Sequence, residues 1–214
     1  MIHGFGSAAP FGLCELLKAL RMNEKALTPD AILDATEAAL RRFGPAKTSV
    51  IDVARALNVS HGSLYRHFDG KAELLDAVVA RWLSRMAGPL SVIAAESGPA
   101  PERLRRWFDI LMASARAKAE NDPDLFGTYL ELARLDRPVV ADHLARLTVH
   151  VAKIIDDGVK QAAFTSVESG MTACAILDAT LRFHHPLHAR EWARPEMKLN
   201  FDAVWRLISR GLSR

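Results

Sequence analysis

The segment from Val59 to Leu75, VSHGSLYRHFDGKAELL, combines many hydrogen-bond donors with very few apolar side chains. Only Leu64 and Phe68, four residues apart, could form a buried stripe on a helix. Short hydroxyl groups suit phosphate oxygens, while imidazole and guanidinium groups can also reach the edges of bases. The donors are Ser60, His61, Ser63, Tyr65, Arg66 and His67. The chemistry that this run can perform is hydrogen bonding to a polyanion.

The residues before this run predict two short helices joined by a tight turn. Thr48 or Ser49 can cap the first, and Ser60 can cap the second. Asn58 lies between them and tolerates the left-handed backbone that a sharp turn requires. This spacing is typical of a helix-turn-helix, here at about 49–68. Its second helix could enter a major groove, where Gly62 would let the backbone approach DNA closely.

Two longer helices should flank this motif. Thr28, followed by Pro29, predicts the start of one helix, which Gly44-Pro45 should end. The other should begin at Lys71 and end near Gly88-Pro89. Thr48 and Lys71 would then lie at helix N-termini, where backbone donors and the helix dipole favour phosphate.

The charge of this region supports a nucleic-acid partner. Between Arg41 and Lys71 there are six basic and two acidic residues, whereas the whole chain of 214 residues has a net charge of only +3. A positive segment of this kind attracts phosphates. The alternative is that these side chains form the solvated face of an ordinary helical domain.

The stretch TSVIDVARALNVSHGSLYRHFDGKAELL resembles the DNA-binding module of the TetR/AcrR family of transcriptional regulators. The resemblance covers about residues 27–86, and it departs from the family pattern mildly at Asn58 and at Asp69-Gly70. The matching residues are Thr48-Ser49, Val53-Ala54, Val59-Ser60, Gly62, Leu64-Tyr65, His67-Phe68, Lys71 and Leu74.

This resemblance implies roles for the donors. Thr48, Tyr65, His67 and Lys71 would hold phosphates, and His61, Gly62, Ser63 and Arg66 would lie nearer the base edges. It also implies a homodimer on double-stranded operator DNA, with a second helical domain that binds a small effector. The expected function is that of a ligand-responsive repressor. The alternative is a DNA-binding dimer whose second domain binds no effector.

The remainder of the chain, 87–214, reads as helices throughout, which makes the protein all-α. Apolar residues recur at spacings of three and four, and no strand-like alternation competes. A capping box at Thr165 and Glu168 predicts the start of one of the last helices. By resemblance, 167–183 and 201–212 would form the dimer contact. The expected domains are therefore an N-terminal extension (1–24), a DNA-binding domain (25–86) and an effector-binding and dimerisation domain (87–214).

Large, adaptable side chains in this second domain could line an effector pocket, although such residues also form ordinary cores. The candidates are Trp107, Met112, Phe126, Tyr129, Met171 and Phe183. Cys174, between two alanines, should be a small buried apolar residue rather than a redox sensor.

No motif for catalysis or a cofactor was found, since phosphate loops, nucleophile elbows, HExxH and CxxC are all missing. We therefore expect neither an enzyme nor a cofactor. His184, His185 and His188 lie close together with Glu191, a combination that can bind zinc. Because Pro186 interrupts the helix, these side chains need not share a face, and no metal is expected. The preferred interpretation is that the histidines are cationic and form hydrogen bonds at a helix end, near the C-terminal dipole.

Composition and the first residues complete the expectations. Two cysteines cannot form a disulfide framework, and no apolar run is long enough to cross a membrane, so a cytoplasmic protein is expected. The segment MIHGFGSAAPFG has neither the basic nor the apolar region of a signal peptide. It is expected to be a flexible tail that precedes a second start at Met22, with a DNA-contacting arm as the alternative.

Overall fold

The computed structural model describes residues 27–214, so the N-terminal extension and Met22 lie outside the described residues. Within 27–214 the ordered elements are helical, apart from one isolated bridge between Phe164 and Ser213. The elements are α2 (Pro29–Lys47), α3 (Val50–Ala56), α4 (His61–Leu64), α5 (Lys71–Ala95), α6 (Ala100–Asn121), α7 (Pro123–Arg134), α8 (Pro138–Lys160), α9 (Ser169–Thr180), η1 (Leu181–Phe183), η2 (Pro186–Glu191) and α10 (Met197–Leu212). The all-α prediction is confirmed.

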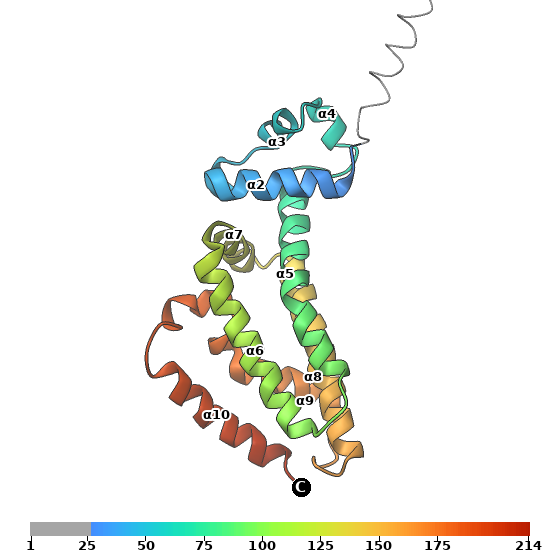
Figure 1. Ribbon diagram of the computed structural model, residues 1–214, viewed down its shortest axis with the longest axis vertical. Helices are drawn as coiled ribbons and strands as arrows, with labels where there is room; N and C mark the ends of the chain where they lie inside the picture. Colours follow the sequence, from blue (N-terminus) through green and yellow to red (C-terminus); the bar gives the residue numbers. More distant parts are fainter. Residues whose placement is uncertain (1–26) are drawn as a thin grey trace, which may run out of the picture.

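Helices α2, α3 and α4 form a head at one end of the molecule, and α5 runs from this head into the body (Figure 1). Local signals set the ends of these helices. The hydroxyl of Thr28 accepts a hydrogen bond from the Ala31 amide at 3.2 Å, and Gly44 breaks the α2 backbone with a φ of 74°. Ser49 caps α3, and Asn58 adopts the predicted left-handed turn with a φ of 54°.

Helix α5 is longer than predicted, because it passes through Gly88-Pro89 and ends at Ala95. Pro89 removes one backbone hydrogen bond, but the residues beyond it, Leu90 and Ile93, are buried. The buried guanidinium of Arg103 then donates to the Ile93 and Ala94 carbonyl oxygens, which lack partners within the helix. Packing and this cap outweigh the proline signal. The domain boundary expected at residue 86 consequently falls inside a continuous helix.

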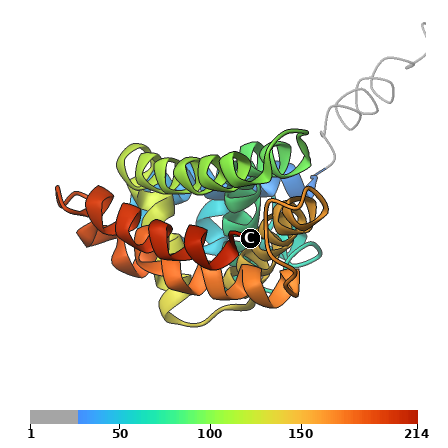
Figure 2. The ribbon, with the colours of Figure 1, turned by 90° about the horizontal axis from the view of Figure 1, so that it is seen from below.

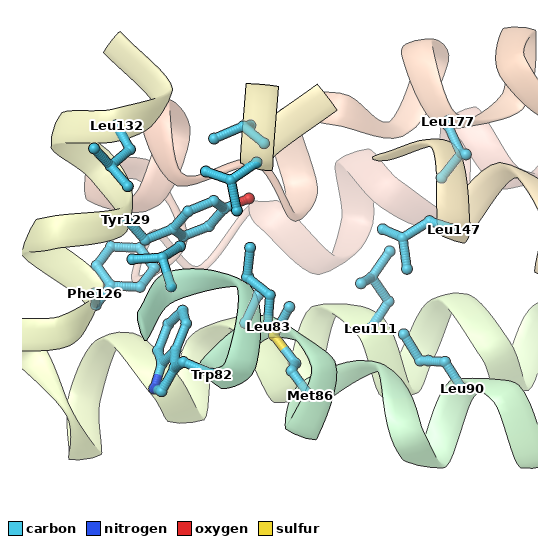
Figure 3. Close-up of a cluster of buried hydrophobic side chains, with 14 of the residues drawn as sticks. Trp82, Leu83, Met86, Leu90, Leu111, Phe126, Tyr129, Leu132, Leu147 and Leu177 are labelled. Carbon is cyan, nitrogen blue, oxygen red and sulfur yellow. The ribbon is translucent and has the colours of Figure 1, made fainter. Parts of the chain in front are cut away.

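The body is a bundle in which α5 packs against α6 and α8, and α8 packs against α9. Seen from below, α10 lies beside α6 and α9 (Figure 2). Figure 3 shows the apolar core where α5 meets α7: Trp82 of α5 lies beside Tyr129 and Phe126 of α7. This core places α7 directly beneath α2, so the head contacts the body through α7 as well as through α5.

Two predictions about the second half are wrong. The capping box does not form as predicted, because α9 begins at Ser169 and the carboxylate of Glu168 is itself the cap, accepting from the amides of Gly170 and Met171. Cys174 is exposed rather than buried, since it lies on the outer face of α9 while its neighbour Ala173 points into the core. Over the described part of the chain, none of the helices is long and apolar enough to cross a membrane.

Candidate nucleic-acid interface

The donors singled out in the sequence form one exposed face around α4. Leu64 is buried, and Val59 and Phe68 pack partly buried against the same core. These three side chains hold α4 on the head and leave the rest of its surface outside. The exposed members of the face are Ser60, His61, Gly62, Tyr65, Arg66 and His67, with Ser63 half-buried among them.

Hydrogen bonds within this face position its side chains. The hydroxyl oxygens of Ser60 and Ser63 are 2.9 Å apart, and Arg66 donates to the Ser63 hydroxyl at 3.3 Å. The rings of His61 and Tyr65 meet edge to face, with centroids 6.2 Å apart. The arrangement is a compact group of donors that a polyanion could engage without displacing any buried contact.

Helix α4 is shorter than the sequence suggested. It makes one regular turn, His61–Leu64, and the chain then continues as turns in which the His67 and Phe68 amides donate to the Leu64 carbonyl oxygen at 2.9 and 3.0 Å. Ser60 occupies the capping position but its side chain makes no capping hydrogen bond, because its hydroxyl pairs with Ser63. His67 therefore projects from a turn rather than from a helix.

Gly62 has room for a side chain. A Cβ added there would meet only the Ser60 hydroxyl oxygen, at an ordinary 3.9 Å. Since the fold does not demand glycine at this position, the lack of a side chain leaves the outer surface of α4 low, as a close approach to DNA would require.

Thr48 and Lys71, two of the predicted phosphate ligands, are also used within the head. Thr48 is buried, and its hydroxyl donates to the Gly44 carbonyl oxygen at 2.8 Å. Lys71 is the first residue of α5, as expected, and its ammonium group donates to the Pro45 carbonyl oxygen at 2.7 Å while staying exposed. Thr48 thus stabilises the corner between α2 and α3, whereas the position of Lys71 leaves donors available to a phosphate.

Charged side chains connect the head to α5. Glu37 of α2 is buried and accepts hydrogen bonds from Arg81 and Arg85. Burial by itself would raise the pKa of Glu37, but the hydrogen bonds and charges of these two arginines lower it below its usual value. The carboxylate therefore stays ionised, and it fixes α2 on α5.

Asp122, at the junction of α6 and α7, makes a second connection between the head and the body, which the sequence did not predict. Asp122 accepts from Arg41 through both carboxylate oxygens, each at 3.1 Å, and from the Trp82 indole N–H at 3.1 Å. One carboxylate thus joins α2, α5 and the start of α7. Asp122 and Arg41 are 81 residues apart, and the segment Asp122-Pro123 reads as an exposed loop. No local pattern could have indicated this contact.

The six predicted effector-pocket residues do not form one cavity. Trp107, Phe126, Tyr129 and Phe183 are buried in the core, whereas Met171 is 74% exposed on α9. Burial raises the pKa of the Tyr129 hydroxyl above its usual value. Only Met112 lines one of the cavities described below. These large side chains belong to the core rather than to a pocket, and the sequence could not separate the two because cores and ligand pockets are lined by the same residue types.

The histidines after α9 take separate partners. His184 is within 3.4 Å of the Thr180 hydroxyl, His185 accepts from the Leu187 amide at 3.4 Å, and His188 lies 3.1 Å from Glu191. Burial lowers the pKa of His184 to about 3, so this ring is neutral rather than cationic. Across 27–214 there is no group of three histidine, cysteine or carboxylate side chains that could hold a metal ion.

Helix order, the positive-φ turn at Asn58 and the exposed donor face define a helix-turn-helix protein with a second, wholly helical domain. Residues 32–78 match the family model of bacterial regulatory proteins, tetR family. Residues 100–205 match the model of a tetracyclin repressor-like C-terminal domain. The chain belongs to the TetR family.

Relatives and solved structures agree with this assignment. The chain is 35% identical over 78 residues to MT1294, an uncharacterised HTH-type transcriptional regulator of Mycobacterium tuberculosis, and the match covers 36% of this chain and 39% of that protein. SmeT, the repressor of the Stenotrophomonas maltophilia multidrug efflux pump SmeDEF, superposes with a TM-score of 0.61 at 16% identity, over 88% of this chain and 92% of SmeT. FadR from Bacillus subtilis, solved with stearoyl-CoA, gives 0.58 at 16% identity, over 86% and 100%.

Proposed function

We propose that the protein is a transcriptional regulator that binds operator DNA as a homodimer and is controlled by a small effector. The observation that carries the proposal is the exposed donor face around α4, which is held by three apolar anchors and lies in the segment Arg41–Lys71, where basic residues outnumber acidic ones by six to two. It is a binding protein rather than an enzyme.

The donors divide into two groups by the part of the DNA that each group contacts. Tyr65, His67 and Lys71 hold phosphates and fix the register of the head on the duplex. His61 and Ser63 on α4, and Arg66 in the turn that follows it, read base edges in the major groove. Thr48 supports this surface through the α2–α3 corner, and Ser60 through its contact with Ser63.

The outer faces of α9 and α10 support a dimer. Met171, Leu199 and Leu207 are each more than 70% exposed, and Cys174 lies on the same face of α9 as Met171. Burial of such apolar surface is the main gain of association. If these faces meet, Cys174 should react slowly with a thiol reagent at high protein concentration and faster on dilution below the dimer dissociation constant. A rate that does not depend on concentration would refute this dimer contact.

The effector is expected in the second domain; FadR from Bacillus subtilis, which shares the fold, was solved in complex with stearoyl-CoA. Two recognition faces must meet major grooves about 34–36 Å apart, or a multiple of it. An effector can release DNA only if it binds more tightly to a state in which the heads are misplaced. The contacts of Asp122 with Arg41 and of Glu37 with Arg81 support such coupling, because they tie α2 of the head to the body.

Selection of bound fragments from genomic DNA tests this function and yields an operator. With that operator, Lys71→Ala should weaken binding to specific and random DNA alike. The slope of log K against the logarithm of the salt concentration should become less steep by about one unit per protomer. Lys160→Ala, at the far end of α8, is the matched control and should change neither. No enriched fragment, or equal behaviour of the two variants, would contradict the proposal.

Gly62→Leu tests the close approach. The added side chain has space in the free protein, and leucine favours a helix, so the melting temperature should stay near that of the wild type. Operator binding should be lost because the side chain would collide with DNA. Normal binding by this variant would show that α4 docks differently.

A further inference from the structure

Two adjoining cavities lie where α6 faces the loop after η2 and the start of α10. The larger has a volume of about 470 Å³ and the smaller of about 200 Å³. Arg116 of α6 and Lys198 of α10 line both. The two cavities therefore form one groove, which is separate from the donor face around α4 and from the helix faces proposed for the dimer.

The larger cavity is rich in positive charge. Arg116, Arg194 and Lys198 line it, against a single carboxylate from Glu120. Arg194 lies 3.7 Å from Glu191, and Lys198 lies 3.2 Å from Asp202, so both cations are partly compensated. Arg116 differs from them, because its Nε is buried and has no hydrogen-bond partner within 27–214.

A buried guanidinium nitrogen without a partner is unfavourable unless something else accepts its hydrogen bond. Arg105 also lines the smaller cavity, but it is already used: it pairs with Asp202 at 2.7 Å and with Asp109 at 3.1 Å. The available donor in the groove is therefore Arg116, which sits where the two cavities meet.

The smaller cavity adds apolar walls. Met112 of α6 and Met197 and Phe201 of α10 line it, and the ring of Trp192 lines the larger cavity. A ligand that fits this groove needs an acceptor group with negative charge for Arg116 and a compact apolar body beside it.

We propose that this groove binds a small organic carboxylate with an apolar body, held by Arg116 and oriented by Lys198 and Arg194. This names the chemical class of the effector, and for its regulatory consequence it rests on the proposed function. The carboxylate would pair with the terminal guanidinium nitrogens of Arg116, because the buried Nε itself is closed to a ligand, and the apolar body would lie against Trp192 and Met112.

A chain of ring contacts connects the groove to the head. Trp192 meets Phe126 of α7 with centroids 5.9 Å apart, and Phe126 meets Tyr129 at 6.3 Å. Tyr129 in turn packs on Trp82 of α5 at 5.9 Å, and the indole N–H of Trp82 donates to Asp122, which Arg41 of α2 also contacts. A ligand that shifts Trp192 therefore acts on α7, the helix directly beneath α2.

Three probes with the same rings and different charge test the ligand class: 1-naphthoate, 1-naphthalenemethanol and 1-naphthylmethylammonium. Calorimetric titration of the full-length, DNA-free protein should show that naphthoate binds at least about tenfold more tightly than either of the others, as a charge-assisted hydrogen bond requires. Equal binding of the three, or no binding of naphthoate at millimolar concentration, would overturn the proposal. Because no DNA is present, this result does not depend on whether the protein is a regulator.

Substitutions then test whether Arg116 holds the carboxylate. Arg116→Gln should weaken naphthoate binding about tenfold or more, whereas Arg106→Gln, on the same helix and outside both cavities, should leave it unchanged. If Arg116→Gln does not fold, Lys198→Gln, on exposed α10 surface, replaces it and should weaken binding about threefold or more. Wild-type affinity in the folded variant would refute the assignment. In a gel-shift assay with the selected operator, naphthoate should release DNA from the wild type and not from Arg116→Gln; release from both would refute the regulatory role.

Discussion

The contact of Asp122 with Arg41 and Trp82 should be a measurable part of the head–body connection. Replacement of Asp122 by alanine removes two charge-assisted hydrogen bonds from Arg41 and the single acceptor that the Trp82 N–H uses. It leaves the backbone at the start of α7 in place. The head and the body should then be held less tightly, and the protein should be less stable.

The magnitude follows from exposure. Arg41 is 44% exposed and Asp122 only 16%, so solvent screens the ion pair and its coupling energy should be about 1 kcal/mol. Trp82 is 1% exposed, and a buried N–H that loses its partner costs about 1–3 kcal/mol. Asp122→Ala should therefore destabilise the protein by about 2–4 kcal/mol in total. Asp122→Asn keeps an acceptor for Trp82 and should cost about 1 kcal/mol.

A double-mutant cycle measures the two contributions. Wild type, Arg41→Ala, Asp122→Ala and the double variant are unfolded in urea at one fixed protein concentration, because the stability of a dimer depends on concentration. The cycle should give a coupling energy of about 1 kcal/mol, and Asp122→Ala should lower the melting temperature by roughly 4–16 °C. If Asp122→Ala stays within about 0.5 kcal/mol of the wild type, or if the coupling energy is zero, the assigned contact does not stabilise the head.

Two further predictions concern the core. Gly158→Ala should destabilise the protein by about 1–3 kcal/mol, because the added Cβ would overlap the buried ring of Phe164, 2.9 Å from its Cγ and closer to the ring edge. The control Gly127→Ala has open space around the added Cβ and should stabilise the protein by up to about 1 kcal/mol. Equal urea midpoints for the two variants would refute this prediction. Burial lowers the pKa of His143 to about 4 and that of His184 to about 3, below the value of about 6.5 in the unfolded chain. Because only the unfolded chain takes up these protons between the two pKa values, the free energy of unfolding is at its full value above pH 6.5 and decreases as the pH falls. Each ring should remove about 2 kcal/mol of unfolding free energy between pH 7 and pH 5, and His143→Leu should reduce the total loss by about 2 kcal/mol; an unchanged pH dependence would show that His143 is not buried in its neutral form.

The sequence by itself determined the features that depend on a few neighbouring residues. Thr28 and Ser49 cap helices with their own hydroxyls, and Asn58 makes the turn, because such contacts reach only three or four residues along the chain. The same local logic placed Leu64 inside and its polar neighbours outside. The family resemblance rests on the same short stretch.

Tertiary structure decided what depends on contacts between distant segments. Helix α5 continues through Pro89 because packing and the distant Arg103 stabilise its last turn, and this outweighs the local cost of proline. Asp122 became a connection rather than a loop carboxylate only when Arg41 and Trp82 came within 3.1 Å of it. The groove at Arg116 likewise exists only where α6 and α10 meet, and its shared lining residues Arg116 and Lys198 are 82 residues apart in sequence (198 − 116). Local contacts set the caps and turns at Thr28, Ser49 and Asn58, but the end of α5, the charge pairs and the cavities are decided only once the helices are packed together.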